Sequence, residues 1–293
     1  MGHKNTLWGV KKERLFQGFK YLVYSLILVN FFYFLREDYL ASTHTYRDGF
    51  NWTQLAEAFS QSTDTLAWWV LLMLFELQTW TLNDEKLDRI KGMISAVGAV
   101  AYAFIIIAFL GYMERMMMTY GFSASSFTDA CSAVGQVLSV AMDLDDYVDL
   151  TAANCASFEG TRWFVNETVG MMVNDEVLTR MHRLSATDVL NAGAWLLIVV
   201  VLEVDVWLTL KRELTDLFYR INTAVKMVLY GTLIVCCLYW AGMGDLVGFW
   251  DAFVWILAFF LIELNLFKWQ EEEEADMERE AIEDAIAKTG DSF

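Results

Sequence analysis

The sequence predicts an all-α integral membrane protein with six transmembrane helices. Hydrophobic residues make up 56% of the 293-residue chain, and the mean hydropathy is +0.35, both high for a water-soluble domain. These residues gather in runs close to the length, about 20 residues, that a helix needs to cross a bilayer. Proline is absent, which predicts straight helices rather than the kinked and broken helices of many transporters.

Six apolar runs are expected to cross the bilayer, each bounded by charge and carrying Trp or Tyr near its ends, as interfacial residues do. The expected spans are Tyr21–Leu35, Thr65–Leu82, Met93–Met113, Val189–Leu210, Met227–Gly242 and Phe249–Trp269. The domain organisation is then a six-helix domain over residues 1–270, with an inserted loop subdomain at residues 114–188. Residues 271–293 form an acidic cytoplasmic tail.

The distribution of basic residues predicts the orientation of the spans. Most of the 21 Lys and Arg lie on the side that holds both termini, and the positive-inside rule makes that side cytoplasmic. The chain is therefore expected to be a multi-pass protein of a plasma membrane or a bacterial inner membrane, with the lipid bilayer as its first partner. The net charge is −17, and the sequence offers no basic stripe. Nucleic acid is therefore not an expected partner.

The outer loop at residues 114–188 is long enough for a small helical extracytoplasmic subdomain between the third and fourth spans. Its apolar residues recur in two groups, at a spacing interpreted as helical: Phe127, Val134, Leu138 and Ala141, then Val169, Met172, Val173 and Val177. Cys131 and Cys155 lie in this loop, where an oxidising compartment favours a disulfide. The neighbouring Cys236 and Cys237 are expected to be small core residues.

Metal and cofactor sites are not expected. One acidic cluster lacks the glycine and the terminal glutamate of an EF-hand loop and is interpreted as a solvated turn. That cluster comprises Asp143, Asp145, Asp146 and Asp149. All three histidines lie outside the expected spans, which argues against a buried haem.

A repeat relates the three even-numbered spans. Each follows the pattern [Asp/Asn]-x3-Trp-x7-Glu-x3-[Trp/Phe]: Asp64, Trp68, Glu76 and Trp80; Asn191, Trp195, Glu203 and Trp207; Asp251, Trp255, Glu263 and Phe267. Each odd-numbered span begins shortly after a lysine, namely Lys20, Lys91 and Lys226. The pattern predicts three tandem two-helix repeats of like orientation.

The intramembrane glutamates Glu76, Glu203 and Glu263 support two interpretations. Burying a carboxylate in lipid costs on the order of 3 kcal/mol, so three of them require compensation. In the first interpretation they line a path for cations or protons, with Asp205 as a further station. In the second, each pairs with a lysine at the start of an odd-numbered span, and the chain is a non-catalytic subunit of a larger membrane complex. A homo- or hetero-oligomer fits both.

An enzyme is the least expected class. No expected span offers a convincing nucleophile or metal-ligand set, and no phosphate- or dinucleotide-binding glycine pattern occurs.

Reporter fusions test the orientation. A fluorescent protein fused after Phe293 is expected to fluoresce in bacteria, and alkaline phosphatase fused there is expected to be inactive, because the C-terminus is cytoplasmic. Fusions truncated after Gly160, in the outer loop, are expected to show the opposite pair of activities. The same activity pattern at both positions would contradict the orientation.

Overall fold

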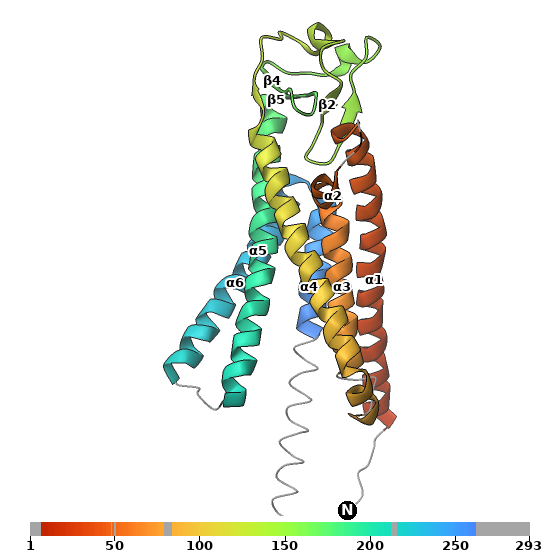
Figure 1. Cartoon of the computed structure of the whole chain (residues 1–293), viewed down its shortest axis with the longest axis vertical. Helices are drawn as coiled ribbons and strands as arrows, with labels where there is room; N and C mark the ends of the chain where they lie inside the picture. The colour runs from red at the N-terminus through yellow and green to blue at the C-terminus, as the bar shows by residue number, and fades with distance from the viewer. Residues whose placement is uncertain (1–6, 48, 50, 79–83, 212–215, 262–293) are drawn as a thin grey trace, which may run out of the picture. The chain divides into compact units, whose positions relative to one another are not determined.

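The computed structural model describes residues 7–47, 49, 51–78, 84–211 and 216–261 (Figure 1). The chain divides into two compact units. One comprises residues 1–26 and 250–293, and the other comprises residues 27–249. The second unit holds the sheet, the disulfide and the cavities described below.

Four helices in the described part of the chain are long and apolar enough to cross a membrane. They are α1 (Leu7–Thr45), α4 (Asp84–Tyr120), α5 (Asp175–Lys211) and α6 (Asp216–Met243). The expected second and sixth spans overlap shorter helices, α3 (Ser60–Glu76) and a helix over Leu246–Leu261. Membrane insertion is thus supported by four candidate spans, and the count of six stays a prediction.

Length and apolar surface explain why α4 and α5 suit a bilayer and also extend beyond it. Each has 37 residues, or about 55 Å at 1.5 Å per residue, against about 30 Å of hydrocarbon. The outer surface of α4 exposes Ile106 and Leu110, whereas Ile105 and Ala108 are fully buried against its neighbours. This alternation leaves one apolar face for lipid and one for packing.

Within residues 27–249, consecutive helices pack together: α3 on α4, α4 on α5, and α5 on α6. The short helix α2 (Trp52–Ala58) also lies against α4. Trp68 of α3 and Trp195 of α5, equivalent positions of the repeat, lie with ring centroids 6.2 Å apart. These two tryptophans and Trp255 are each at least nine-tenths buried. The tryptophan column therefore serves packing in all three even-numbered segments.

The segment between α4 and α5 folds as a β-sheet, so the expected helical subdomain is wrong. Its strands are β1 (Ser123–Ala124), β2 (Ser139–Ala141), β3 (Tyr147–Asp149), β4 (Trp163–Asn166) and β5 (Met171–Asn174). Their order is β1-β4-β5-β2-β3, and every neighbouring pair is antiparallel except β2 with β5. We call residues 121–174 the head.

The strands of the head are too short to show a period of two in the sequence. Each has two to four residues, and β5 is buried at successive positions Met171, Met172 and Val173, because it lies in the middle of the sheet. Met172 packs in one core with Val140 and Trp163. Burial of consecutive residues on a central strand produced the spacing that was interpreted as helical.

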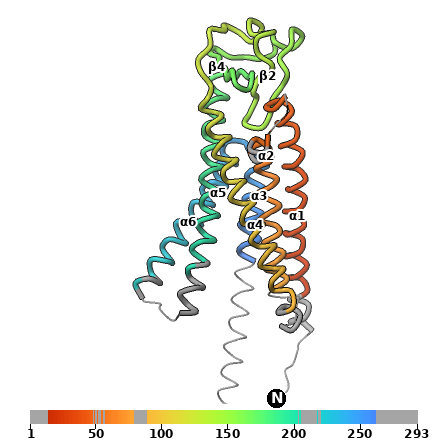
Figure 2. Tube along the Cα trace, viewed as in Figure 1, coloured from red at the N-terminus to blue at the C-terminus, as the bar shows by residue number. Residues whose placement is uncertain are grey.

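The predicted disulfide is confirmed. Cys131 and Cys155 are bonded, and they join two short 3-10 helices, η2 (Ala130–Ala133) and η3 (Cys155–Ser157). The head is also continuous with two membrane helices, since β1 follows α4 closely and α5 starts directly after β5 (Figure 2). The Asn174 side chain caps α5 by accepting a hydrogen bond from the Val177 amide.

Removing the disulfide is expected to destabilise the head. The two cysteines are 24 residues apart, and cross-linking a loop of this size contributes about 3 kcal/mol by restricting the unfolded chain. Protease digestion of the Cys131→Ala/Cys155→Ala double variant in membranes measures the effect. Cys236→Ala is the matched control, because Cys236 is a buried free cysteine outside the head. Equal digestion of both proteins would contradict the expectation.

Candidate functional site

The structure describes some, but not all, of the residues that the repeat singled out. Glu76 ends α3 and is 5% exposed, and Lys20 on α1 is fully buried. Lys226 is half-buried and Lys91 is exposed. Glu203 and Asp205 belong to α5, but their side chains lie outside the described part of the structure, as does the whole of Glu263. The pore and the lysine pairs therefore stay predictions.

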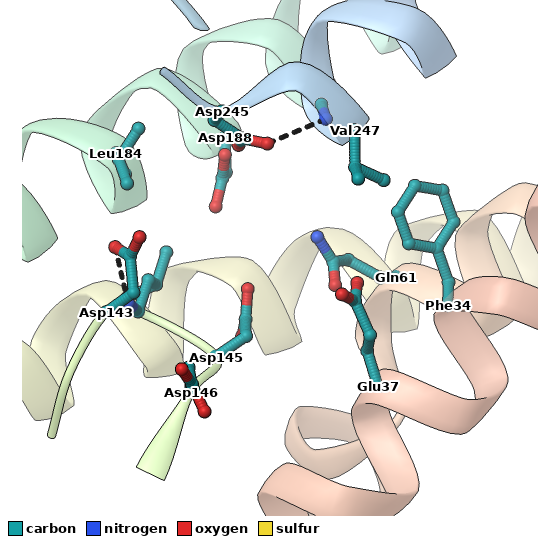
Figure 3. Close-up of a pocket in the computed structure, with 12 residues that line it drawn as sticks. Phe34, Glu37, Gln61, Asp143, Asp145, Asp146, Leu184, Asp188, Asp245 and Val247 are labelled. Carbon is teal, nitrogen blue, oxygen red and sulfur yellow. Dashed lines mark hydrogen bonds between the residues drawn. The ribbon is translucent and has the colours of Figure 1, made fainter. Parts of the chain in front are cut away.

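A different set of carboxylates meets in a cavity at the junction of helices and head (Figure 3). The cavity has a volume of about 160 Å³, and among the described residues that line it there is neither Lys nor Arg. Six of those residues are acidic: Glu37, Asp143, Asp145, Asp146, Asp188 and Asp245. We call this space the acidic cavity.

The acidic residues come from four separate parts of the fold. Glu37 lies on α1, Asp188 lies on α5, and Asp245 lies in the turn that follows α6. The remaining three belong to the β2–β3 hairpin turn, residues 143–146, where the Met142 amide bonds back to the Asp146 carbonyl. The turn is thus built by strand pairing, and its three aspartates line the cavity.

A buried arginine neutralises part of this charge. Arg115 of α4 donates from Nη1 to Asp145 Oδ1 at 2.6 Å, and its Nη2 lies 3.5 Å from Asp38 Oδ1. Nη2 also donates to the Ser60 hydroxyl at 3.2 Å. The guanidinium, with a side chain only 8% exposed, therefore joins α1, α3, α4 and the head. A second arginine, Arg180, pairs with Asp143 of the cavity wall at 2.8 Å.

Asp38 also caps a neighbouring helix. Its Oδ2 accepts from both the amide and the hydroxyl of Ser62, at 2.9 and 2.7 Å. Ser62 lies in the first turn of α3, whose own N-cap residue, Phe59, makes no side-chain cap. A carboxylate at a helix N-terminus is stabilised by the unsatisfied amides and by the helix dipole. Ser62 therefore donates to one oxygen of Asp38, and Arg115 lies beside the other.

Burial shifts the pKa of two cavity carboxylates that lie outside the helices. It raises the pKa of Asp145 even though Arg115 lies beside it, and it raises the pKa of Asp245. Asp245 follows Gly244, which has φ +81°, and accepts a hydrogen bond from the Gly248 amide at 2.8 Å. Asp245 is thus both a helix cap and a member of the cavity wall. A second positive charge in the cavity would favour the ionised forms.

A cluster of serine, histidine and aspartate near the end of α1 is not a catalytic triad. His44 Nδ1 lies 3.2 Å from Ser139 Oγ and also 3.2 Å from Asp149 Oδ1. A triad uses opposite ring nitrogens for the nucleophile and the carboxylate, and Ser139 is fully buried. Arg47 completes the cluster by pairing with Asp149. The cluster instead tethers the head to the end of α1.

Tight metal coordination is not supported in the described residues. No group there of three or more His, Cys, Asp or Glu could hold a metal ion. The carboxylates of the acidic cavity are spread around its wall, which suits hydrated cations better than a fixed, dehydrated ion.

Comparison with known proteins gives no relative: no family model, curated protein or solved structure matches this chain.

Sequence reasoning interpreted the Asp143–Asp149 cluster as a solvated turn and did not single out Asp38, Arg115 or Asp188. A signal for these three was present. Each is a charged residue within three positions of an expected span end, at Leu35, Met113 or Val189. Charges at that depth are costly unless they are paired or hydrated.

The head tether predicts a specific pH dependence. The hydrogen bond from Arg47 lowers the pKa of Asp149, so this carboxylate stabilises the folded head above its ordinary pKa of about 4. Its contribution is lost as the pH falls through the lowered value. The stability difference between wild type and Asp149→Asn is expected to be up to about 1 kcal/mol at pH 7, since the pair is largely exposed, and to vanish in stronger acid.

Urea titration of the head, followed by limited proteolysis from pH 7 down to pH 3, measures this difference. Glu159→Gln is the control, because Glu159 is an exposed head carboxylate. A difference that grows toward low pH would contradict the tether.

Proposed function

We propose that this chain is a multi-pass membrane protein that conducts or transports cations, which it gathers in the acidic cavity. The observation that carries the proposal is the composition of the cavity wall: six acidic residues, with neither Lys nor Arg among the lining residues. Two of the six are neutralised by ion pairs in the described structure, Asp143 by Arg180 and Asp145 by Arg115. The other four are Glu37, Asp146, Asp188 and Asp245, so acidic side chains outnumber the basic side chains paired with them.

Electrostatics favour this use of the cavity. A cleft lined by charge of one sign, with low-dielectric walls, concentrates counter-ions and speeds their arrival by 10-fold or more. Rings of acidic residues are the usual device by which cation channels attract ions. The spread of the carboxylates supports transient occupancy, as conduction requires, rather than tight storage.

The inner part of the proposed path uses the repeat. In the proposal α3 and the helix Leu246–Leu261 complete six spans, and Glu76, Glu203 and Glu263 form the cytoplasmic end of the route. The burial of Glu76 supports a site for charge within the helical layer. In the proposal both termini face the cytoplasm, so the acidic cavity belongs to the outer half of the route.

A structural role is the second candidate, and one observation favours it. The head exposes Leu138 and Met142, which are 54% and 42% accessible, although neither lies in an expected span. Exposed apolar side chains on a water-facing sheet suit contact with another protein. In this alternative the chain is an accessory subunit. The acidic cavity then only holds water at the junction of the helices and the head.

Ion flux into liposomes tests the proposal. The purified full-length chain is reconstituted, and the uptake of K⁺, Ca²⁺ and H⁺ is followed with ion-sensitive dyes. The Glu37→Gln/Asp188→Asn double variant is expected to lower cation flux about tenfold at low ionic strength, because the cavity loses two charges that concentrate ions. The effect is expected to shrink at 1 M salt, where screening acts within about 3 Å.

Glu159→Gln supplies the matched control, since it removes a carboxylate from the head surface away from the cavity. It is expected to leave flux at the wild-type value. The proposal would be overturned if the wild type and the double variant showed equal flux of all three ions at both salt concentrations.

A further inference from the structure

A second, smaller cavity lies beside the acidic cavity. It has a volume of about 30 Å³ and is bounded by the outer end of α1, by α2, by α4 and by the head. Its polar walls include Tyr46 and Glu57, whose side chains are hydrogen-bonded, and burial raises the pKa of Glu57. We call it the antechamber.

The two cavities share one residue. Asp145 lines both, and its ion-pair partner Arg115 lines the antechamber. Along α1, the acidic cavity is lined by Phe34 and Glu37, and the antechamber by residues 41 to 46. Eight residues of helix, from Glu37 to Thr45, correspond to about 12 Å, so the antechamber lies nearer the outer end of α1. The Arg115–Asp145 pair therefore stands at the boundary between the two spaces.

Arg115 is held so that it can lose one partner and keep the others. Asp38 and Ser60 lie on membrane helices, whereas Asp145 lies on the head turn and keeps 28% of its side chain exposed. A cation that binds the accessible carboxylate replaces the guanidinium there. The guanidinium then remains paired with Asp38, which avoids the high cost of an uncompensated buried charge.

We propose that the Arg115–Asp145 ion pair is the gate between the antechamber and the acidic cavity, with the guanidinium acting as a tethered cation that an incoming cation displaces from Asp145. This inference rests on the proposed cation function. It assigns Asp145 a role opposite to that of Asp188: Asp188 attracts ions, whereas Asp145 holds the passage closed.

The test compares K⁺ flux through the full-length chain in liposomes for Asp145→Asn and Asp188→Asn, which remove the same charge from the same cavity. Asp188→Asn is expected to lower the flux. Asp145→Asn is expected to raise it about tenfold, the factor that corresponds to about 1.4 kcal/mol of closing energy. The double variant Arg115→Gln/Asp145→Asn also removes this ion pair, together with the contacts of Arg115 to Asp38 and Ser60, and is likewise expected to raise the flux.

Two controls separate gating from loss of structure. Asp149→Asn weakens the other ionic tether of the head and lines neither cavity, so its flux is expected to equal that of the wild type. Formation of the Cys131–Cys155 disulfide and a single chromatographic peak report folding. If Arg115→Gln prevents assembly, the partly exposed Asp145 still decides the question through Asp145→Asn alone.

The outcomes distinguish the gate from the function on which it depends. Flux that falls or stays unchanged in Asp145→Asn, while Asp188→Asn lowers it, would overturn the gate and leave cation conduction supported. An increase in Asp149→Asn equal to that in Asp145→Asn would overturn the gate too, since loosening of the head would explain both. Flux that does not respond to Glu37 or Asp188 would overturn the cation function and the gate together.

Discussion

The guanidinium of Arg115 is the point at which helices α1, α3 and α4 meet the head. An arginine remains charged at any ordinary pH, so burying it requires acceptors on every accessible side. Asp38, Ser60 and Asp145 supply them from three separate segments. Removing one member of a buried pair costs about 3–5 kcal/mol, because the other charge is left uncompensated. The position of the β2–β3 turn relative to the helices, and hence the wall of the acidic cavity, depends on this contact.

The surroundings of this contact separate two kinds of stability. The helices expose apolar side chains, such as Ile106 and Leu110, over lengths that suit a bilayer. The head has a small core of its own around Val140, Trp163 and Met172, closed by a disulfide. A sheet of such short strands is marginal without further constraint. Its covalent continuity with α4 and α5 provides part of that constraint, and the ionic contacts to α1 and α4 provide the rest.

The carboxylates gather at the junction of the helices and the head, where four parts of the fold meet. Deep in the bilayer, six acidic residues would be prohibitively costly, and on an open surface their field would be screened within about 10 Å. A cavity of about 160 Å³ with polar walls reduces both costs, because it has room for water and is partly enclosed. The raised pKa of Asp145 and of Asp245 shows the residual cost of this arrangement. Occupation by cations would offset it, which links the electrostatics to the proposed function.

The helices were predictable because hydrophobic runs are local. A stretch such as Met93–Met113 is apolar at nearly every position, and burial in lipid rather than partner contacts selects the helix. Local hydrophobic patterns could not predict the strands of the head. Strands β2 and β5 are only three and four residues long, and they pair in parallel although they are far apart in the sequence. Their spacing of apolar residues matched a helix by coincidence. The repeat singled out Trp68 and Trp195, which are buried in the structure, while the roles of its glutamates stay predictions.

By itself, then, the sequence determined the membrane class, the main apolar helices and the Cys131–Cys155 pair. Each depends on composition within a short window or on the few cysteines available. Only the tertiary structure decided which charges meet. Arg115 lies 30 residues from Asp145 and 55 from Ser60, and Asp38 lies 24 from Ser62. Contacts at such separations depend on how helices and strands pack in three dimensions, and one sequence read along its length holds no direct record of that packing.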